Sequence, residues 1–411
     1  MACEQLPIST VATALTPLYT LPMSTQSRSS FSPLFGRSFA AVAVLCGALS
    51  ACGASHLAAP ADMNDVMRSV HEYGKGHPAA AVAPASNPVV PFAAAGDPYN
   101  TDESYKAHIA ILFVQHDYAG LEKEISSARA TKARLQGGIW KIAMFYDAVG
   151  HAIPAFGGST VDWDAHLADI KKWIAAYPES AAARVALAEA YVNDAWEARG
   201  HGYANTVSES GWNNFGERIQ LAESALLDAA KLKEKCPYWY EAMQEVALAQ
   251  GWDRDEARAL FDEATAFEPA YYHYYRQYAN YMMPRWYGDE GETQAFAEES
   301  AKRLPEPDGS IVYFEIASML VCPCDEQNND MDSMSWPKIK QGYATIEKLY
   351  GISRLKTNRF AYMSVVAKDK ESARATFARI GEDWHYKVWI DHRYFEKAKA
   401  WATAAEASRG R

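Results

Sequence analysis

Apolar residues recur every three to four positions along most of this chain, which is the spacing of one face of an α-helix. The pattern begins near Thr101 and continues almost to the C-terminus. No stretch alternates apolar and polar residues over a length that would form a core β-strand. The sequence therefore predicts an all-α fold.

A motif of small and bulky residues repeats in register with this helical pattern. Its clearest copy is Ala257, Phe261, Ala264 and Pro269, whose spacing A-x3-F-x2-A-x4-P is that of the second helix in a tetratricopeptide hairpin. The small residues let a partner helix approach closely, and the bulky residues fill the groove beside it. Further second-helix copies are Ala222, Leu226, Ala229; Thr293, Ala297, Ser300; and Ala373, Phe377, Ile380.

First-helix patterns alternate with these copies along the chain. They are Arg184, Leu187, Ala188, Tyr191; Tyr275, Tyr278, Ala279, Met282; Tyr313, Ile316, Ala317, Leu320; and Phe360, Met363, Ser364, Ala367. We therefore predict a tetratricopeptide-like α-solenoid of stacked antiparallel helical hairpins over residues 98–411, closed by a capping helix over 389–405. The alternative is a helical bundle whose periodicity is accidental.

The N-terminal region reads as an export signal. An apolar stretch over 39–51 follows Arg28 and Arg37 and is too short to span a bilayer. Leu49-Ser50-Ala51-Cys52 resembles a bacterial lipoprotein cleavage box. We expect residues 1–51 to be a signal peptide with an N-terminal extension, and lipidated Cys52 to begin the mature chain. Translation could start at Met1 or at Met23, and the sequence leaves this choice open. The alternative is a plain secretory signal.

Residues 52–97 are rich in alanine and proline, and we expect them to form a tether with one short helix over 62–71. Gly53 follows the lipidated cysteine, and a non-acidic residue there is typical of outer-membrane lipoproteins. The expected location is the bacterial cell envelope, on the periplasmic side of the outer membrane, with the lipid anchor as the only membrane contact.

Charge excludes one class of partner. The chain carries 40 lysine and arginine residues against 51 aspartate and glutamate residues, and no run of five or more like charges. Phosphate binding needs a concentrated positive face, so nucleic acid is not an expected partner.

Two loops interrupt the repeat at equivalent places, over 198–212 and 282–291. Each combines arginine, tyrosine, tryptophan and glycine. Insertions at corresponding points of a solenoid lie on one face, which is often the binding face. An arginine beside aromatic rings can hold a carboxylate or a sugar, or can simply stack.

The sequence contains the stretches AWEARGHGYANTV, GWNNFGERI, CPYWY, GWDR and PRWYG, and the C-terminal run NRFAYMSVVAKDKESARATFARIGEDW. Together they resemble the bacterial domain of unknown function 4034, a tetratricopeptide-like family. The resemblance spans Tyr105 to Trp389. It implies the helical-repeat fold and no established activity. The characteristic positions of the family are Trp196, Arg199, Tyr203, Trp212, Arg218, Trp239, Trp252, Arg285, Trp286 and Gly288. All of them except Gly288 are our candidate binding residues. The alternative role for them is to wedge and bridge adjacent hairpins.

Enzyme signatures are missing from the sequence. There is no G-x-S-x-G, H-E-x-x-H, phosphate loop or dinucleotide fingerprint. We expect no metal and no cofactor, because the histidines lack ligand spacing and the acidic loop over 324–332 lacks the glycine of a calcium loop. Whether Cys236 forms a disulfide with Cys322 or Cys324 is left open. Because the three cysteines are odd in number, we expect at least one thiol to be free and buried.

These observations favour a binding module: an envelope lipoprotein that holds a protein or peptide partner as a scaffold or adaptor, with catalysis not expected. One alternative is an enzyme acting on cell-wall glycans, for which Glu197, Glu217, Asp289 and Glu290 are candidate carboxylates. Another is a passive scaffold that holds no small ligand.

Overall fold

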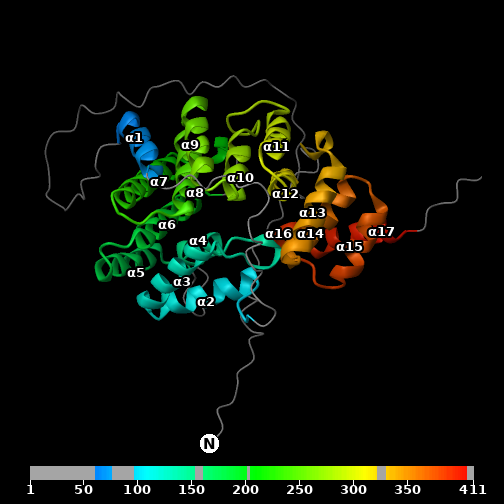
Figure 1. The fold of residues 1–411 in the computed structure, drawn as a ribbon, viewed down its shortest axis with the longest axis horizontal. Helices are drawn as coiled ribbons and strands as arrows, with labels where there is room; N and C mark the ends of the chain where they lie inside the picture. Colours follow the sequence, from blue (N-terminus) through cyan, green and yellow to red (C-terminus); the bar gives the residue numbers. More distant parts are fainter. Residues whose placement is uncertain (1–60, 76–96, 153–160, 201–203, 322–329, 405–411) are drawn as a thin grey trace, which may run out of the picture. The chain divides into compact units, whose positions relative to one another are not determined.

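The computed structural model describes residues 61–75, 97–152, 161–200, 204–321 and 330–404 (Figure 1). These residues form 17 α-helices and no strand, and the sole β-type contact among them is an isolated bridge between Arg134 and Trp140. The all-α prediction is confirmed. Residues Ala61–Ile153 and Val161–Arg411 make up one compact unit. The predicted signal peptide and Cys52 lie outside the described residues.

The helices follow one another with short connections. They are α1 (Met63–Gly74), α2 (Asp102–Val114), α3 (Tyr118–Thr131), α4 (Lys141–Gly150), α5 (Trp163–Ala176), α6 (Ala181–Arg199), α7 (Glu209–Ala230), α8 (Pro237–Gln250), α9 (Arg254–Phe267), α10 (Tyr272–Tyr281), α11 (Glu292–Arg303), α12 (Asp308–Leu320), α13 (Trp336–Tyr350), α14 (Arg354–Val366), α15 (Lys370–Ile380), α16 (Tyr386–Trp389) and α17 (His392–Thr403). Short 3₁₀ turns are η2 (Gln136–Gly138), η3 (Ala204–Thr206) and η4 (Asp330–Ser333).

Helix ends are set by local sequence. Asp253 caps α9 in a reciprocal box with Glu256, whose side chain accepts from the Asp253 backbone N–H at 2.9 Å. Pro237 occupies the first turn of α8, where its missing N–H costs nothing. Gly251 ends that helix at φ 70°, a left-handed conformation that glycine adopts without strain.

The helices pack in the order that hairpin repeats predict. Neighbours in sequence contact each other in the pairs α2–α3, α6–α7, α8–α9, α10–α11, α12–α13 and α14–α15. The first helices of these pairs, together with α4, also contact one another in a continuous row, α2–α4–α6–α8–α10–α12–α14. The polar side chains on one face of this row are therefore brought into a common space.

The repeat motif occupies the contacts that it was expected to make. Ala257, Phe261 and Ala264 of α9 are all buried. The Phe261 ring stacks on Tyr278 of α10 with centroids 4.8 Å apart, and it meets Tyr275 edge-on at 5.3 Å. The second helix of one hairpin thus fits against the first helix of the next.

The first hairpins also contact the last ones. Turn η2, between α3 and α4, packs against α13. A Cβ on Gly137 would lie 2.8 Å from Ser353 Oγ, and one on Gly138 would lie 2.9 Å from the Tyr350 ring. Both glycines have positive φ, so their backbone conformation and their close packing exclude larger residues.

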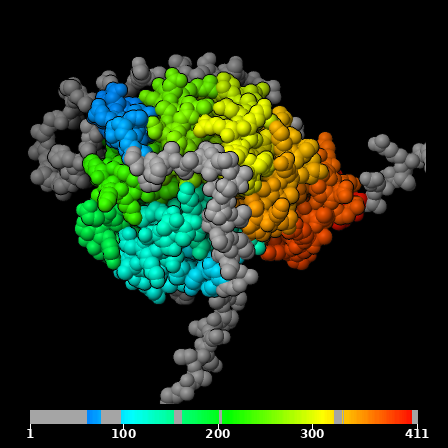
Figure 2. All heavy atoms as spheres, in the orientation of Figure 1, coloured from blue at the N-terminus to red at the C-terminus, as the bar shows by residue number. Residues whose placement is uncertain are grey.

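Helix α1 packs against the helical domain. The expected short helix over 62–71 exists, but it packs against α7 and α9 instead of lying in a free tether (Figure 2). Val66 and Val70 are completely buried, and the Tyr73 ring stacks on Trp239 at 4.0 Å. These three residues form an apolar stripe that α7, α8 and α9 cover, and the compact unit includes the residues from Ala61 onward.

Cysteine chemistry agrees with the expectation of a free thiol. Cys236 is unpaired and buried. Its backbone N–H donates to the Tyr73 hydroxyl at 2.8 Å, which ties α1 to the start of α8. Cys322 and Cys324 lie outside the described residues.

Close approach of α12 and α13 makes Gly342 a test of the packing. A Cβ there would lie 2.3 Å from the Ser310 carbonyl oxygen and 2.6 Å from Phe314 Cβ. We expect Gly342→Ala to lower the free energy of unfolding by about 1–3 kcal/mol, because α12 and α13 must separate. The control is Gly216→Ala in α7, where no atom lies within 4 Å of the added Cβ, and a gain of about 0.5–1 kcal/mol is expected. Urea unfolding of both variants measures the difference, and equal stabilities would contradict the close approach.

Candidate functional site

Four of the predicted binding residues meet in one cluster. Trp196 of α6 contacts Trp286, in the loop after α10, edge-on with ring centroids 5.9 Å apart. The Arg199 guanidinium lies 5.6 Å from the Trp196 ring and 5.0 Å from the Trp212 ring. The two predicted loops therefore converge. Trp212 is 39% exposed, so the cluster presents an aromatic and basic surface to solvent.

The other predicted residues have partners within the fold. Arg218 Nε donates to Asp194 Oδ2 at 2.5 Å, and Arg285 Nη2 donates to Asn280 Oδ1 at 3.1 Å. Trp239 and Trp252 are buried, which matches the alternative of wedging between hairpins. The Trp239 indole donates to the Leu226 carbonyl at 2.8 Å. Tyr203 lies outside the described residues.

Gly288, the remaining characteristic position, sets the shape of the loop after α10. A Cβ on this glycine would lie 1.9 Å from the Met282 carbonyl oxygen. The loop can fold back on the end of α10 because no side chain is present at this position.

A cavity of about 320 Å³ lies along the row of first helices. Its walls come from α2, α4, α6, α8 and α10, and from the beginning of α14 and α16. Residues as distant in sequence as Asp102 and Lys387 line it. The cavity is small enough to enclose a single amino-acid or sugar unit.

Three carboxylates gather on one wall of this cavity. Glu189 comes from α6, and Glu241 and Glu245 lie one turn apart on α8. Tyr271 Oη donates to Glu241 Oε2 at 2.6 Å, and Gln277 Nε2 donates to Glu245 Oε1 at 2.6 Å. None of the three has a lysine or arginine within 4.0 Å among the described residues.

Glu189 is only partly satisfied. Its Oε1 accepts from Asn193 Nδ2 at 3.0 Å. Its Oε2 is buried and has no hydrogen-bond partner among the described residues, although the nearby Tyr238 hydroxyl offsets part of the rise in the pKa of this carboxyl group. A buried oxygen without a partner is costly, and it indicates a place for a donor from a ligand or water.

Burial and mutual repulsion raise the pKa of the carboxyl groups on this wall. Burial, with the added repulsion of Glu241, raises the pKa of Glu245 to about 8. Burial and the charge of Glu245 raise the pKa of Glu189 well above its ordinary value. Across the cavity, burial and a hydrogen bond with Glu103 raise the pKa of Asp102 to about 7. The cavity therefore has proton donors at neutral pH and takes on more negative charge as the pH rises.

His273 of α10 adds a potential acceptor. Its Nδ1 lies 3.0 Å from Glu241 Oε1, and its Nε2 is buried without a hydrogen-bond partner among the described residues. A carboxylate at Nδ1 favours the proton on that nitrogen, which leaves the lone pair of a neutral ring on Nε2. Glu241 thus orients the ring for whatever enters the cavity.

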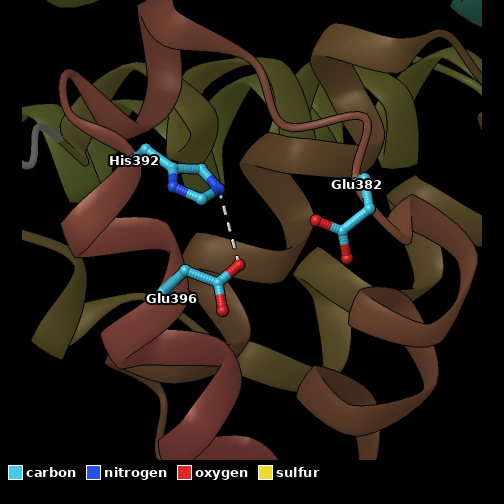
Figure 3. Close-up of side chains that lie close together, drawn as sticks. All are labelled: Glu382, His392 and Glu396. Atoms are coloured by element: carbon cyan, nitrogen blue, oxygen red, sulfur yellow. Dashed lines mark ion pairs between the residues drawn. The ribbon is translucent and has the colours of Figure 1, made fainter.

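Among the described residues, one group has donor atoms close enough together to hold a metal ion: Glu382, His392 and Glu396 (Figure 3). All three side chains are exposed, and His392 Nε2 lies 3.5 Å from Glu396 Oε1. Lys399 Nζ lies 2.8 Å from Glu382 and 3.9 Å from Glu396. A lysine ammonium already pairs with both carboxylates, so we interpret the group as a surface ion-pair network.

The four carboxylates suggested for glycan chemistry are not part of the cavity. Glu197 accepts from the Trp163 indole at 3.0 Å, and Asp289 is largely exposed beside Arg254. The cavity is lined instead by Glu241, which directly follows the CPYWY motif, and by Glu245, one helical turn later. Their spacing of four residues on a first helix was the available sequence signal.

None of the helices in the described ranges is both long and apolar enough to cross a membrane. Comparisons of the chain with protein-family models, curated proteins and solved structures found no match. The resemblance to the domain of unknown function 4034 therefore stays a prediction.

The raised pKa of Glu245 predicts a pH-dependent cost to stability. Between pH 4.5 and 8 the unfolded chain ionises this group while the folded chain keeps it protonated, so the wild type loses stability as the pH rises. We expect Glu245→Gln to gain stability relative to the wild type over this window, by up to about 1.4 kcal/mol per pH unit. Urea unfolding at pH 5, 6.5 and 8 measures the trend, with the exposed Glu290→Gln as control. A constant difference between Glu245→Gln and wild type would contradict it.

Proposed function

We propose that the protein is an envelope lipoprotein that binds a protein or peptide partner by taking an ammonium group of that partner into the cavity. The observation that carries the proposal is the wall formed by Glu189, Glu241 and Glu245, with an unpartnered oxygen on Glu189. An ammonium group has three donors and no acceptor, which suits a wall of carboxylate oxygens.

Electrostatics favours a cation as the occupant. Three carboxylates face the cavity, and no lysine or arginine of the described residues lies within 4.0 Å of them; burial therefore raises the pKa of Glu189 and Glu245. An entering ammonium would replace the protons on these two groups and turn mutual repulsion into attraction. A single metal ion fits less well. In the described part of the chain, these carboxylates do not bring three ligand atoms within 4.8 Å of one another.

The rest of the partner has a surface to contact. The cluster of Trp196, Arg199, Trp212 and Trp286 is partly exposed and combines aromatic faces with a guanidinium. Aromatic and arginine side chains dominate protein interfaces. The cleavage box that ends at Cys52 supports placement of the protein in the envelope, with a lipid anchor as its membrane contact.

Calorimetric titration with blocked peptides tests this function. We expect a peptide that contains lysine to bind and the same peptide with acetyl-lysine not to bind, because acetylation removes the charge. Affinity should rise between pH 6 and 8, by up to about tenfold per pH unit for each proton that leaves the glutamates. Titrations in buffers of different ionisation enthalpy count those protons.

Matched variants locate the binding site. Glu189→Gln and Glu245→Gln should weaken binding at pH 8, whereas Glu290→Gln, on the exposed loop after α10, should not. Binding of the acetylated peptide with equal affinity would rule out ammonium recognition.

A second candidate function is hydrolysis of a cell-wall glycan. The observation that favours it is a carboxylic acid that stays protonated at neutral pH, Glu245, one helical turn from a second carboxyl group, Glu241. Glycosidases use such a pair at roughly 5–10 Å, one group protonating the leaving oxygen and the other assisting the attack of water.

We expect this candidate, if correct, to give new reducing ends when the protein is incubated with purified envelope glycans. Glu245→Gln should abolish the release because it removes the proton donor, and Glu290→Gln should not. No release by the wild type between pH 5 and 8 would exclude the hydrolase.

A further inference from the structure

Among the described residues that line the cavity, most of the basic side chains contact an acidic partner and one does not. Lys106 forms an ion pair with Asp147, and His151 Nδ1 lies 3.4 Å from the same carboxylate. His273 contacts Glu241. Lys387 is the remaining cation in the lining, and no carboxylate of the described residues lies within 4.0 Å of its ammonium group. One wall of the cavity thus has an uncompensated cation.

This cation lies on a different wall from the glutamates. Lys387 belongs to α16, which packs on α14 and α17. Glu241 and Glu245 belong to α8, which packs on α4, α6, α7, α9 and α10. Lys387 is exposed while Glu241 is buried, so the positive group lies toward solvent and the negative wall lies deeper.

We infer that the cavity binds an amphoteric group: the end of a peptide that carries an ammonium and a free carboxylate, such as a C-terminal lysine or a similar diamino acid. Its side-chain ammonium enters the wall of Glu189, Glu241 and Glu245, and its α-carboxylate pairs with Lys387. This inference rests on the proposed ammonium recognition and adds the second charge.

Size and charge both favour this ligand. A cavity of about 320 Å³ is at the lower end of ligand sites, so it can enclose one residue but not a folded segment. A ligand with a single positive charge would leave Lys387 unpaired, whereas an amphoteric end satisfies both walls. The alkyl chain of a lysine would then lie against the apolar lining, which includes Met144 and Leu355.

Two peptides that differ in one group test the inference. The probes are an N-acetylated tripeptide ending in lysine with a free carboxylate, and the same tripeptide ending in a carboxamide. For the full chain we expect the carboxamide to bind at least tenfold more weakly at pH 8. Lys387→Gln should weaken binding of the free acid by a similar factor and leave the carboxamide unchanged. Lys397→Gln, an exposed lysine on α17 away from the cavity, is the charge-matched control and should change neither.

The outcomes separate this inference from the proposed function. Equal binding of the two peptides, or equal loss of both in Lys387→Gln, would overturn the amphoteric ligand and leave ammonium recognition in place. Failure of the wild type to bind either peptide would overturn both. A loss confined to the free acid in Lys387→Gln would support the pairing of that carboxylate with Lys387.

Discussion

The fold depends on how closely its helices approach one another. Ala188, Ala279 and Ala317 are fully buried at equivalent first-helix positions, and Gly342 touches the backbone of the preceding helix. Larger residues there would push the helices apart. Because the helices of the row pack closely, charged side chains buried between them either pair with one another or remain uncompensated.

Both solutions occur along the same row. On α10, α12 and α14, the buried Glu315 is paired with Lys356 and accepts from Arg276 Nη1 at 3.3 Å, so its charge is balanced. The cavity carboxylates Glu189, Glu241 and Glu245, on α6 and α8, have only neutral donors or a histidine, and burial raises the pKa of Glu189 and Glu245. A protein can keep such unbalanced groups only where the rest of the fold is stable enough to tolerate them, and they are often functional for that reason.

Local patterns were sufficient to predict the helices and their pairing. The positions of Ala257, Phe261 and Ala264 determine a contact with the next helix whatever lies elsewhere. The cavity could not be predicted in the same way, because Asp102 and Lys387 are far apart in the sequence and line it together only through the packing of the whole row of helices. Similarly, Trp239 in CPYWY was a candidate binding residue or a wedge between hairpins, and its stacking on Tyr73 of α1 could not be read from the local pattern.

The docking of α1 changes what a lipid at Cys52 would do. A free spacer up to residue 97 would let the domain tumble far from the bilayer. With Met63 already fixed on α7 and α9, roughly ten residues remain, which reach at most about 40 Å when fully extended. The lipid would then be joined to one side of the domain by a short linker. It would fix which side faces the bilayer and restrict the partners that the cavity can reach to those near the membrane surface.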